Sequence, residues 1–103
     1  MTVSSPRPEL DPVTLARARR GDRRALRELV ELHAPRVHAL VARMMVGRPA
    51  EVDDLCQEAL VKVVRGVAGF DPAGPARLSS WVLTIATRTC IDALRRARRE
   101  PPP

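Results

Sequence analysis

The C-terminal third of the chain carries arginines at a spacing that suits contact with phosphate groups. Read as a helix at about 100° per residue, the segment WVLTIATRTCIDALRRARRE has one broad apolar face. The other face carries the single tryptophan, an aspartate and several arginines: Trp81, Arg88, Asp92, Arg95, Arg96 and Arg99. Guanidinium groups bind phosphates and an exposed ring can stack on a base, so this face favours contact with DNA or RNA. The alternative is a solvated helix end whose positive charge suits the helix dipole.

The segment from Glu51 to Val67, EVDDLCQEALVKVVRGV, combines an apolar stripe with a polar face. As a helix, it turns Asp54, Gln57, Glu58 and Arg65 away from the apolar stripe formed by Val52, Leu55, Cys56, Ala59, Leu60, Val63 and Val67. Val61 lies in the middle of the polar face. An apolar residue ringed by polar groups is typical of protein interfaces and predicts a docking surface. A single exposed valine is also ordinary on a soluble protein, and that reading stays open at this point.

Length and charge limit the possible architectures and partners. The 103 residues fit one domain, and with 2% aromatic residues its core must be aliphatic. The net charge of +6 favours a polyanionic partner, either nucleic acid or an acidic membrane surface. Residues 51–70 nevertheless have a local charge of −2. This separation of charge indicates two partners on two surfaces.

Several kinds of chemistry find no support in the sequence. Cys56 and Cys90 have no Cys or His neighbours at metal-binding spacing, and we interpret them as reduced core thiols rather than a disulfide. His33 and His38 lack a second ligand or a carboxylate at catalytic spacing, so packing or snorkelling is favoured for both over metal binding or acid–base chemistry. We predict no enzyme, no cofactor and no metal. No apolar run is long enough to span a bilayer and no signal peptide is recognisable, so a cytoplasmic location is expected.

The sequence predicts an all-α fold, a compact bundle of three to four helices over residues 11–99. Residues 1–10 are expected to be a disordered lead. Asp11 is an N-cap candidate for a helix over residues 12–20, which Gly21 ends. Asp22 then caps a longer helix that reaches Val46 and is expected to kink at Pro35 without dividing.

The second half of the chain repeats this alternation of helix and turn. The acidic helix ends near Gly66, and glycines and prolines make residues 68–78 a loop. Ser79 or Ser80 is expected to cap the last helix, which ends before the prolines at residues 101–103. Residues 100–103 are interpreted as the start of a proline-rich linker.

With both helices placed, the sequence resembles the second conserved region of bacterial sigma factors of the extracytoplasmic-function group. The matching segments are GDRRALRELVELHAPRV, EVDDLCQEALVKV and GFDPAGPARLSSWVLTIATRTCIDALRRARR. Their order and spacing make the match specific, and together they cover nearly all of residues 11–99. The resemblance implies a compact helical bundle that recognises promoters.

The resemblance also implies a role for each surface. The family's acidic helix docks on the coiled coil of the largest RNA polymerase subunit, and the matching residues here are Asp54, Gln57, Glu58, Val61 and Arg65. The family's next loop and helix read the minus-ten element of the non-template strand and help to open the duplex. The matching DNA-binding residues are Phe70, Asp71, Arg77, Leu78, Ser79, Ser80, Trp81, Arg88, Arg95, Arg96 and Arg99. An anti-sigma factor is a further partner that the resemblance implies.

The chain departs from the family pattern at three points. Arg88 replaces an Asn tied to base recognition, and an arginine can clamp phosphate or read guanine instead. Val30, His33 and His38 replace aromatics, which changes packing more than function. The family's second DNA-binding domain, which reads the minus-thirty-five element, has no counterpart in the 103 residues, so we expect a fragment of a longer protein rather than a lone module.

Two other functions compete with promoter recognition. The first is a sigma-like protein-interaction module, an adaptor or anti-sigma target, that binds polymerase but does not open DNA. Arg88 in place of Asn is its main support. The second is a generic basic bundle that coats nucleic acid, for which the acidic helix would have no use.

Overall fold

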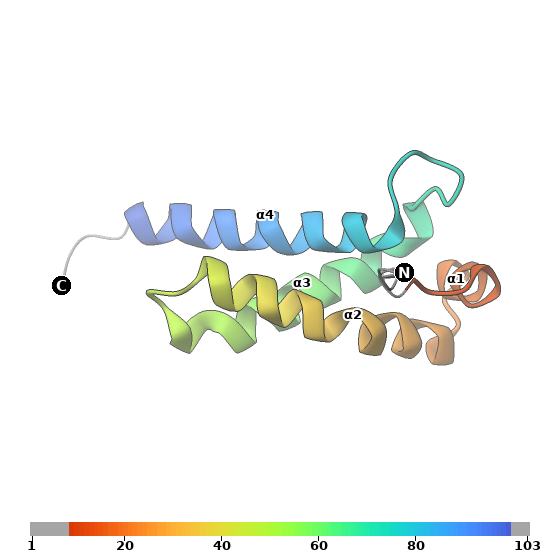
Figure 1. Ribbon diagram of the computed structural model, residues 1–103, viewed down its shortest axis with the longest axis horizontal. Coiled ribbons are helices and arrows are strands. Elements are labelled where there is room, and N and C mark those ends of the chain that lie inside the picture. The colour runs from red at the N-terminus through yellow and green to blue at the C-terminus, as the bar shows by residue number, and fades with distance from the viewer. Residues whose placement is uncertain (1–8, 100–103) are drawn as a thin grey trace, which may run out of the picture.

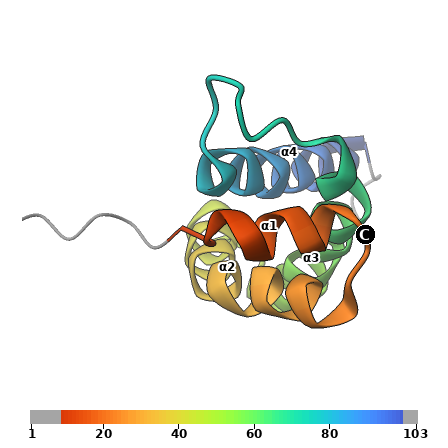
Figure 2. The ribbon, with the colours of Figure 1, turned by 90° about the vertical axis from the view of Figure 1, so that its right-hand side faces the viewer.

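The computed structural model describes residues 9–99 and confirms an all-α fold. Within these residues the α-helices are α1 (Pro12–Arg19), α2 (Arg23–Met44), α3 (Val52–Gly66) and α4 (Leu78–Arg99), with short 3₁₀ helices at Pro49–Glu51 and Val67–Gly69. Figure 1 shows α4 running along the length of the bundle over α2 and α3. Figure 2 shows α1 crossing one end of the bundle. It also shows the loop that precedes α4 rising above α4.

The N-terminal helices begin and end where capping residues predict. The Asp11 carboxylate accepts hydrogen bonds from Thr14 N at 2.9 Å and from Thr14 Oγ at 2.6 Å. The Asp22 carboxylate accepts from Arg24 N at 2.9 Å and from Ala25 N at 3.2 Å. Between the two helices, Gly21 has a φ of 90°, a left-handed conformation that a side chain disfavours. Both predicted N-caps and the predicted stop at Gly21 are therefore confirmed.

The long helix α2 continues through Pro35, as predicted. Proline lacks a backbone N–H, so the turn before Pro35 loses one helical hydrogen bond without ending the helix. The helix stops at Met44, two residues before the predicted end at Val46, and Met45 is its C-cap.

The core is aliphatic and is formed where α2, α3 and α4 meet. Fully buried side chains from all three helices fill it, among them Leu29, Val37, Val41, Ala59, Val63, Val82 and Ala86. Leu15 and Ala18 of α1 close one end. Because aliphatic burial provides most of the stabilisation of such a bundle, this core fixes how α3 and α4 lie relative to each other.

The cysteines and one histidine lie inside this core, as predicted. Cys56 and Cys90 are free and buried, and desolvation raises the pKa of both thiols. The buried His33 places Nδ1 2.8 Å from the Leu29 carbonyl oxygen, to which the Nδ1–H tautomer donates. His33 therefore packs within the bundle.

The start of α4 differs from the prediction. The helix begins at Leu78, so Ser79 and Ser80 lie in its first turn and neither is the cap. Instead, Glu9 Oε1 accepts hydrogen bonds from Ser79 N at 3.3 Å and from Ser79 Oγ at 3.1 Å. Glu9 belongs to the stretch predicted to be disordered, and its contacts with α4 correct that prediction for this residue. Residues 1–8 and 100–103 lie outside the described part of the chain.

Candidate polymerase and nucleic-acid interfaces

The polar face of α3 carries an open apolar groove. Val61 is 45% exposed, and the predicted docking residues Asp54, Gln57, Glu58 and Arg65 are also exposed on α3. The groove has a volume of about 410 Å³ and is lined by Val30, Gln57, Leu60, Val61, Val64 and Arg65. We call this the docking groove. Three of the five predicted docking residues line it, with Asp54 and Glu58 on the same helix.

A second hollow extends the docking groove along α2. It has a volume of about 520 Å³ and is lined by Arg23, Leu26, Arg27, Val30, Glu31 and Val64. Val30 and Val64 line both hollows, so an apolar strip follows the junction of α2 and α3. Sequence reasoning missed the α2 side of this strip. The signal in the sequence was Val30, a second apolar residue directly after Leu29. In the structure Leu29 is buried in the core, whereas Val30 is half-buried and lines the groove.

The exposed side of α4 carries the predicted arginines. Arg88, Arg95, Arg96 and Arg99 are all exposed, and we call them the arginine surface. Ser80 and Arg77 are exposed at the start of the same helix. All six of these residues were predicted to bind DNA, and the structure leaves them exposed along α4 and at the residue before it.

Trp81 is half-buried rather than fully exposed. Its ring lies against Phe70, with centroids 5.4 Å apart and planes inclined by 50°. The ring also lies over Gly66, where an added Cβ would come within 3.2 Å of Trp81 Cζ2. Trp81 of α4 thus packs against the end of α3 and the start of the loop, and the residue remains partly exposed.

The loop before α4 is held by buried side chains at its two ends. Phe70, Leu78 and Ser79 are buried, so in this conformation they cannot contact DNA directly as predicted. The physical reason is that two large apolar side chains gain more from burial in the core than from exposure on a loop. Their role here is to anchor the loop.

Between these anchors, the loop is shaped by its own turn. The exposed Asp71 accepts a hydrogen bond from Ala73 N at 2.9 Å through its side chain. Its backbone carbonyl accepts another from Gly74 N at 3.1 Å. An aspartate that bonds the backbone two residues on is a common way to form a turn. Asp71 therefore supports the loop conformation while remaining at the surface.

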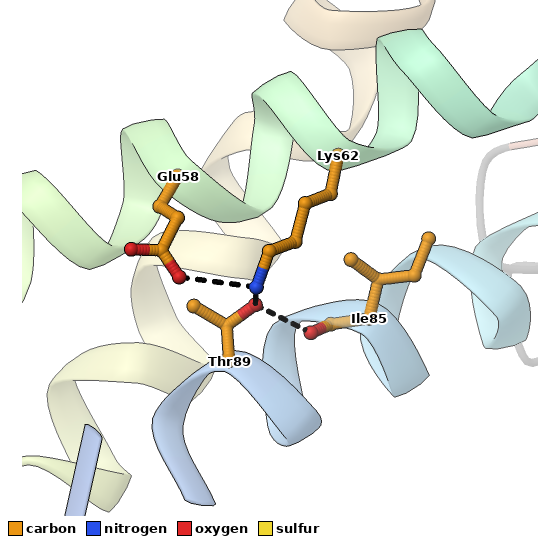
Figure 3. A network of polar contacts seen from close by, with 4 residues as sticks. All are labelled: Glu58, Lys62, Ile85 and Thr89. Atoms are coloured by element: carbon orange, nitrogen blue, oxygen red, sulfur yellow. Dashed lines mark hydrogen bonds and ion pairs between the residues drawn. The ribbon is translucent and has the colours of Figure 1, made fainter. Parts of the chain in front are cut away.

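A polar network joins α3 to α4 (Figure 3). Lys62 Nζ donates hydrogen bonds to Glu58 Oε2 at 3.0 Å and to Thr89 Oγ1 at 3.2 Å. Thr89 Oγ1 in turn donates to the Ile85 carbonyl oxygen at 2.8 Å. Sequence reasoning assigned no role to Lys62, although its spacing of four residues from Glu58 predicts an ion pair on one helix face.

No helix among residues 9–99 has the length and apolar character needed to cross a membrane.

Comparison with known proteins gives consistent matches. The Sigma-70 region 2 family matches residues 29–100. RNA polymerase sigma factor CarQ of Myxococcus xanthus is 37% identical over 84 residues, which are 82% of this chain and 47% of that protein. The ECF RNA polymerase sigma factor SigM of Mycobacterium tuberculosis is 36% identical over 81 residues, 79% of this chain and 40% of that protein. The chain thus spans less than half the length of these two relatives.

A solved structure matches nearly the whole domain. The NMR structure of an engineered region 2 of sigmaE in complex with GTAAAA is 31% identical to this chain and has a TM-score of 0.74. The match covers 84% of this chain and 87% of that one. The chain therefore belongs to the Sigma-70 region 2 family, as a region 2 domain of the extracytoplasmic-function type.

Proposed function

We propose that this domain serves promoter recognition in transcription initiation. It docks on the largest-subunit coiled coil of core RNA polymerase through the docking groove and reads the separated non-template strand of a minus-ten element through α4 and the preceding loop. The observation that carries this proposal is the presence of two different surfaces on one bundle. One is an apolar groove edged by Gln57 and Arg65, and the other is the arginine surface.

The docking groove suits a helical protein partner. An open apolar strip along two helices can receive the apolar side of a third helix, and the polar residues around it can set its orientation. Asp54 and Glu58 add negative charge on the same side of α3. In this proposal, residues 11–99 form the functional domain and the protein acts in the cytoplasm. An anti-sigma factor is the expected inhibitory partner.

The arginine surface suits a single strand of DNA. Four exposed guanidinium groups on one helix can bind successive phosphates, and the partly exposed Trp81 can contact a base. Turning a base out of the stack costs a few kcal/mol, which phosphate contacts and a shaped loop can offset. No covalent step is part of this function.

The docking proposal is tested by binding to the polymerase coiled-coil fragment. Val61→Asp places a charge in the middle of the docking groove and should weaken binding at least tenfold, because an unpaired charge would be buried at the interface. Val13→Asp is the matched control, since Val13 is 61% exposed on α1 and lies outside the groove. Equal affinity of the Val61→Asp variant and the parent chain would refute docking at this groove.

The DNA proposal is tested by selecting hexamers from a randomised single-stranded pool. We expect the selected sequence to bind more tightly than its scrambled counterpart, with an affinity that falls steeply with salt. Arg95→Gln should weaken binding of the selected strand and of the scrambled strand alike, because a phosphate contact carries no sequence information. Equal binding of selected and scrambled strands would refute sequence recognition.

A second candidate function is a polymerase-binding module without strand opening. Arg88 in place of the family's usual Asn and the partly covered ring of Trp81 favour it. Such a module would bind the coiled-coil fragment as the parent chain does but would show no preference among single strands. The two assays above therefore separate the candidates.

A further inference from the structure

Lys62 lies between the two proposed binding surfaces. Its ammonium group is 3.0 Å from the Glu58 carboxylate on α3 and 3.2 Å from the Thr89 hydroxyl on α4. The Lys62 and Glu58 side chains are 45% and 43% exposed, whereas Thr89 is buried. The positive charge is therefore partly exposed. Figure 3 shows the Lys62 side chain reaching from α3 toward Thr89 on α4.

The arginine surface borders this junction. Arg88 precedes Thr89 in the chain, and Arg96 follows it by seven residues, two helical turns further along the same side of α4. Asp92 is the one carboxylate of α4, and Glu58 is the α3 carboxylate that pairs with Lys62. Lys62 thus reaches α4 at Thr89, one residue after Arg88 and seven residues before Arg96.

We propose that Lys62 is a further phosphate-binding residue of the DNA surface, whose charge Glu58 neutralises in the free domain and which polymerase docking releases. The inference rests on the proposed function, since it needs Glu58 in the polymerase interface and DNA on α4. When a partner group engages the Glu58 carboxylate, the flexible lysine stem is free to turn toward a phosphate. The Thr89 hydroxyl keeps the ammonium group at the edge of α4 during this exchange.

Docking and DNA binding then become linked. A partner that binds Glu58 raises the affinity for DNA, and DNA raises the affinity for that partner by the same factor. The factor is small because an exposed ion pair between residues four apart on a helix is weak. We expect a twofold to threefold change, about the ratio that breaking such a pair produces.

The experiment measures binding of the 103-residue chain to a fluorescent single strand, with and without saturating coiled-coil fragment. In the parent chain the fragment should raise DNA affinity about twofold to threefold. It should also steepen the slope of the logarithm of the DNA association constant against the logarithm of salt concentration by about 0.7, the value for one added phosphate contact on a single strand. Lys62→Gln should remove both effects while the fragment still binds. Arg99→Gln is the matched control, because it should lower DNA affinity by the same factor with and without the fragment.

A second pair of variants tests the role of Glu58. Glu58→Gln should raise the DNA affinity of the free chain about twofold and leave the fragment little to add, because Lys62 is already released. Asp53→Asn removes the same charge from α3, but its side chain is 93% exposed and faces His38 instead. It should therefore raise DNA affinity less than Glu58→Gln does.

The outcomes separate this inference from the function on which it rests. A parent chain that binds neither the fragment nor DNA would overturn both. A parent chain that binds both, with a coupling that Lys62→Gln leaves intact, would overturn the inference alone. Equal effects of Glu58→Gln and Asp53→Asn on DNA affinity would also overturn it, since general charge repulsion would then account for the result.

Discussion

Glu9 is expected to stabilise the whole bundle through the first turn of α4. Its Oε1 atom accepts from the backbone and hydroxyl groups of Ser79 and lies 3.3 Å from Arg77 Nε. Glu9→Ala removes all three contacts and leaves the buried Ser79 hydroxyl without this acceptor. The unpaired N–H groups at the start of a helix are the groups that a capping carboxylate satisfies.

The magnitude follows from the geometry of these contacts. Loss of a helix cap costs about 1 kcal/mol. The ion pair with Arg77 adds less than about 0.5 kcal/mol, because the Arg77 side chain is 56% exposed. The sum, about 1 to 1.5 kcal/mol, should lower the Tm of a domain of this size by about 4–12 °C.

Thermal unfolding followed by circular dichroism at the helical minimum measures this change. Glu28→Ala is the matched control, since it removes the same type of side chain from an exposed position on α2. In a double-mutant cycle, Ser79→Ala should cost less stability in the Glu9→Ala background than in the parent chain. A Tm that Glu9→Ala leaves unchanged, or strictly additive losses in the cycle, would refute the capping role.

Three further predictions concern backbone strain, capping and the buried thiols. Gly21→Ala should destabilise the domain by about 1–2 kcal/mol in a denaturant titration, because Gly21 has a φ of 90°; unchanged stability would contradict this strain. The Thr14 contacts lower the pKa of Asp11, so its contribution to stability is present above the unfolded-state pKa and is lost as the pH falls through the lower folded-state pKa; Asp11→Asn should remove this part of the pH dependence of unfolding. Burial raises the pKa of Cys56 and Cys90, so both should react slowly with a thiol reagent at neutral pH until the domain unfolds; rapid labelling of the native chain would contradict their burial.

The separation of the two surfaces limits how far a substitution on one affects the other. Val61 and the arginines lie on different helices, and the core between α3 and α4 holds those helices in place. Substitutions far apart that share no partner usually have additive effects. Lys62 is the exception, because its hydrogen bonds reach both helices.

Local signals in the sequence were sufficient to predict most of the helices and the exposed faces of α3 and α4. Asp11, Gly21 and Asp22 mark helix ends because capping and left-handed turns depend on a few neighbouring residues. The exposed sides of α3 and α4 follow from helical periodicity, which places Val61 and Arg88 opposite their apolar stripes. These features involve residues close together in the chain.

Contacts between distant parts of the chain decided the cap of α4, the lining of the docking groove and the burial of the loop ends. The pattern of neighbouring residues does not encode such contacts directly. Glu9 caps a helix that starts 69 residues later, and Val30 lines a groove with Val61 only because α2 packs beside α3. Phe70 belongs to a loop by its neighbours, yet the available core space beside Trp81 buries it. Which side chains fill the core depends on how the helices pack. The side chains that anchor the loop before α4, and the hydrogen bonds of Lys62 to both α3 and α4, are therefore seen only in the folded bundle.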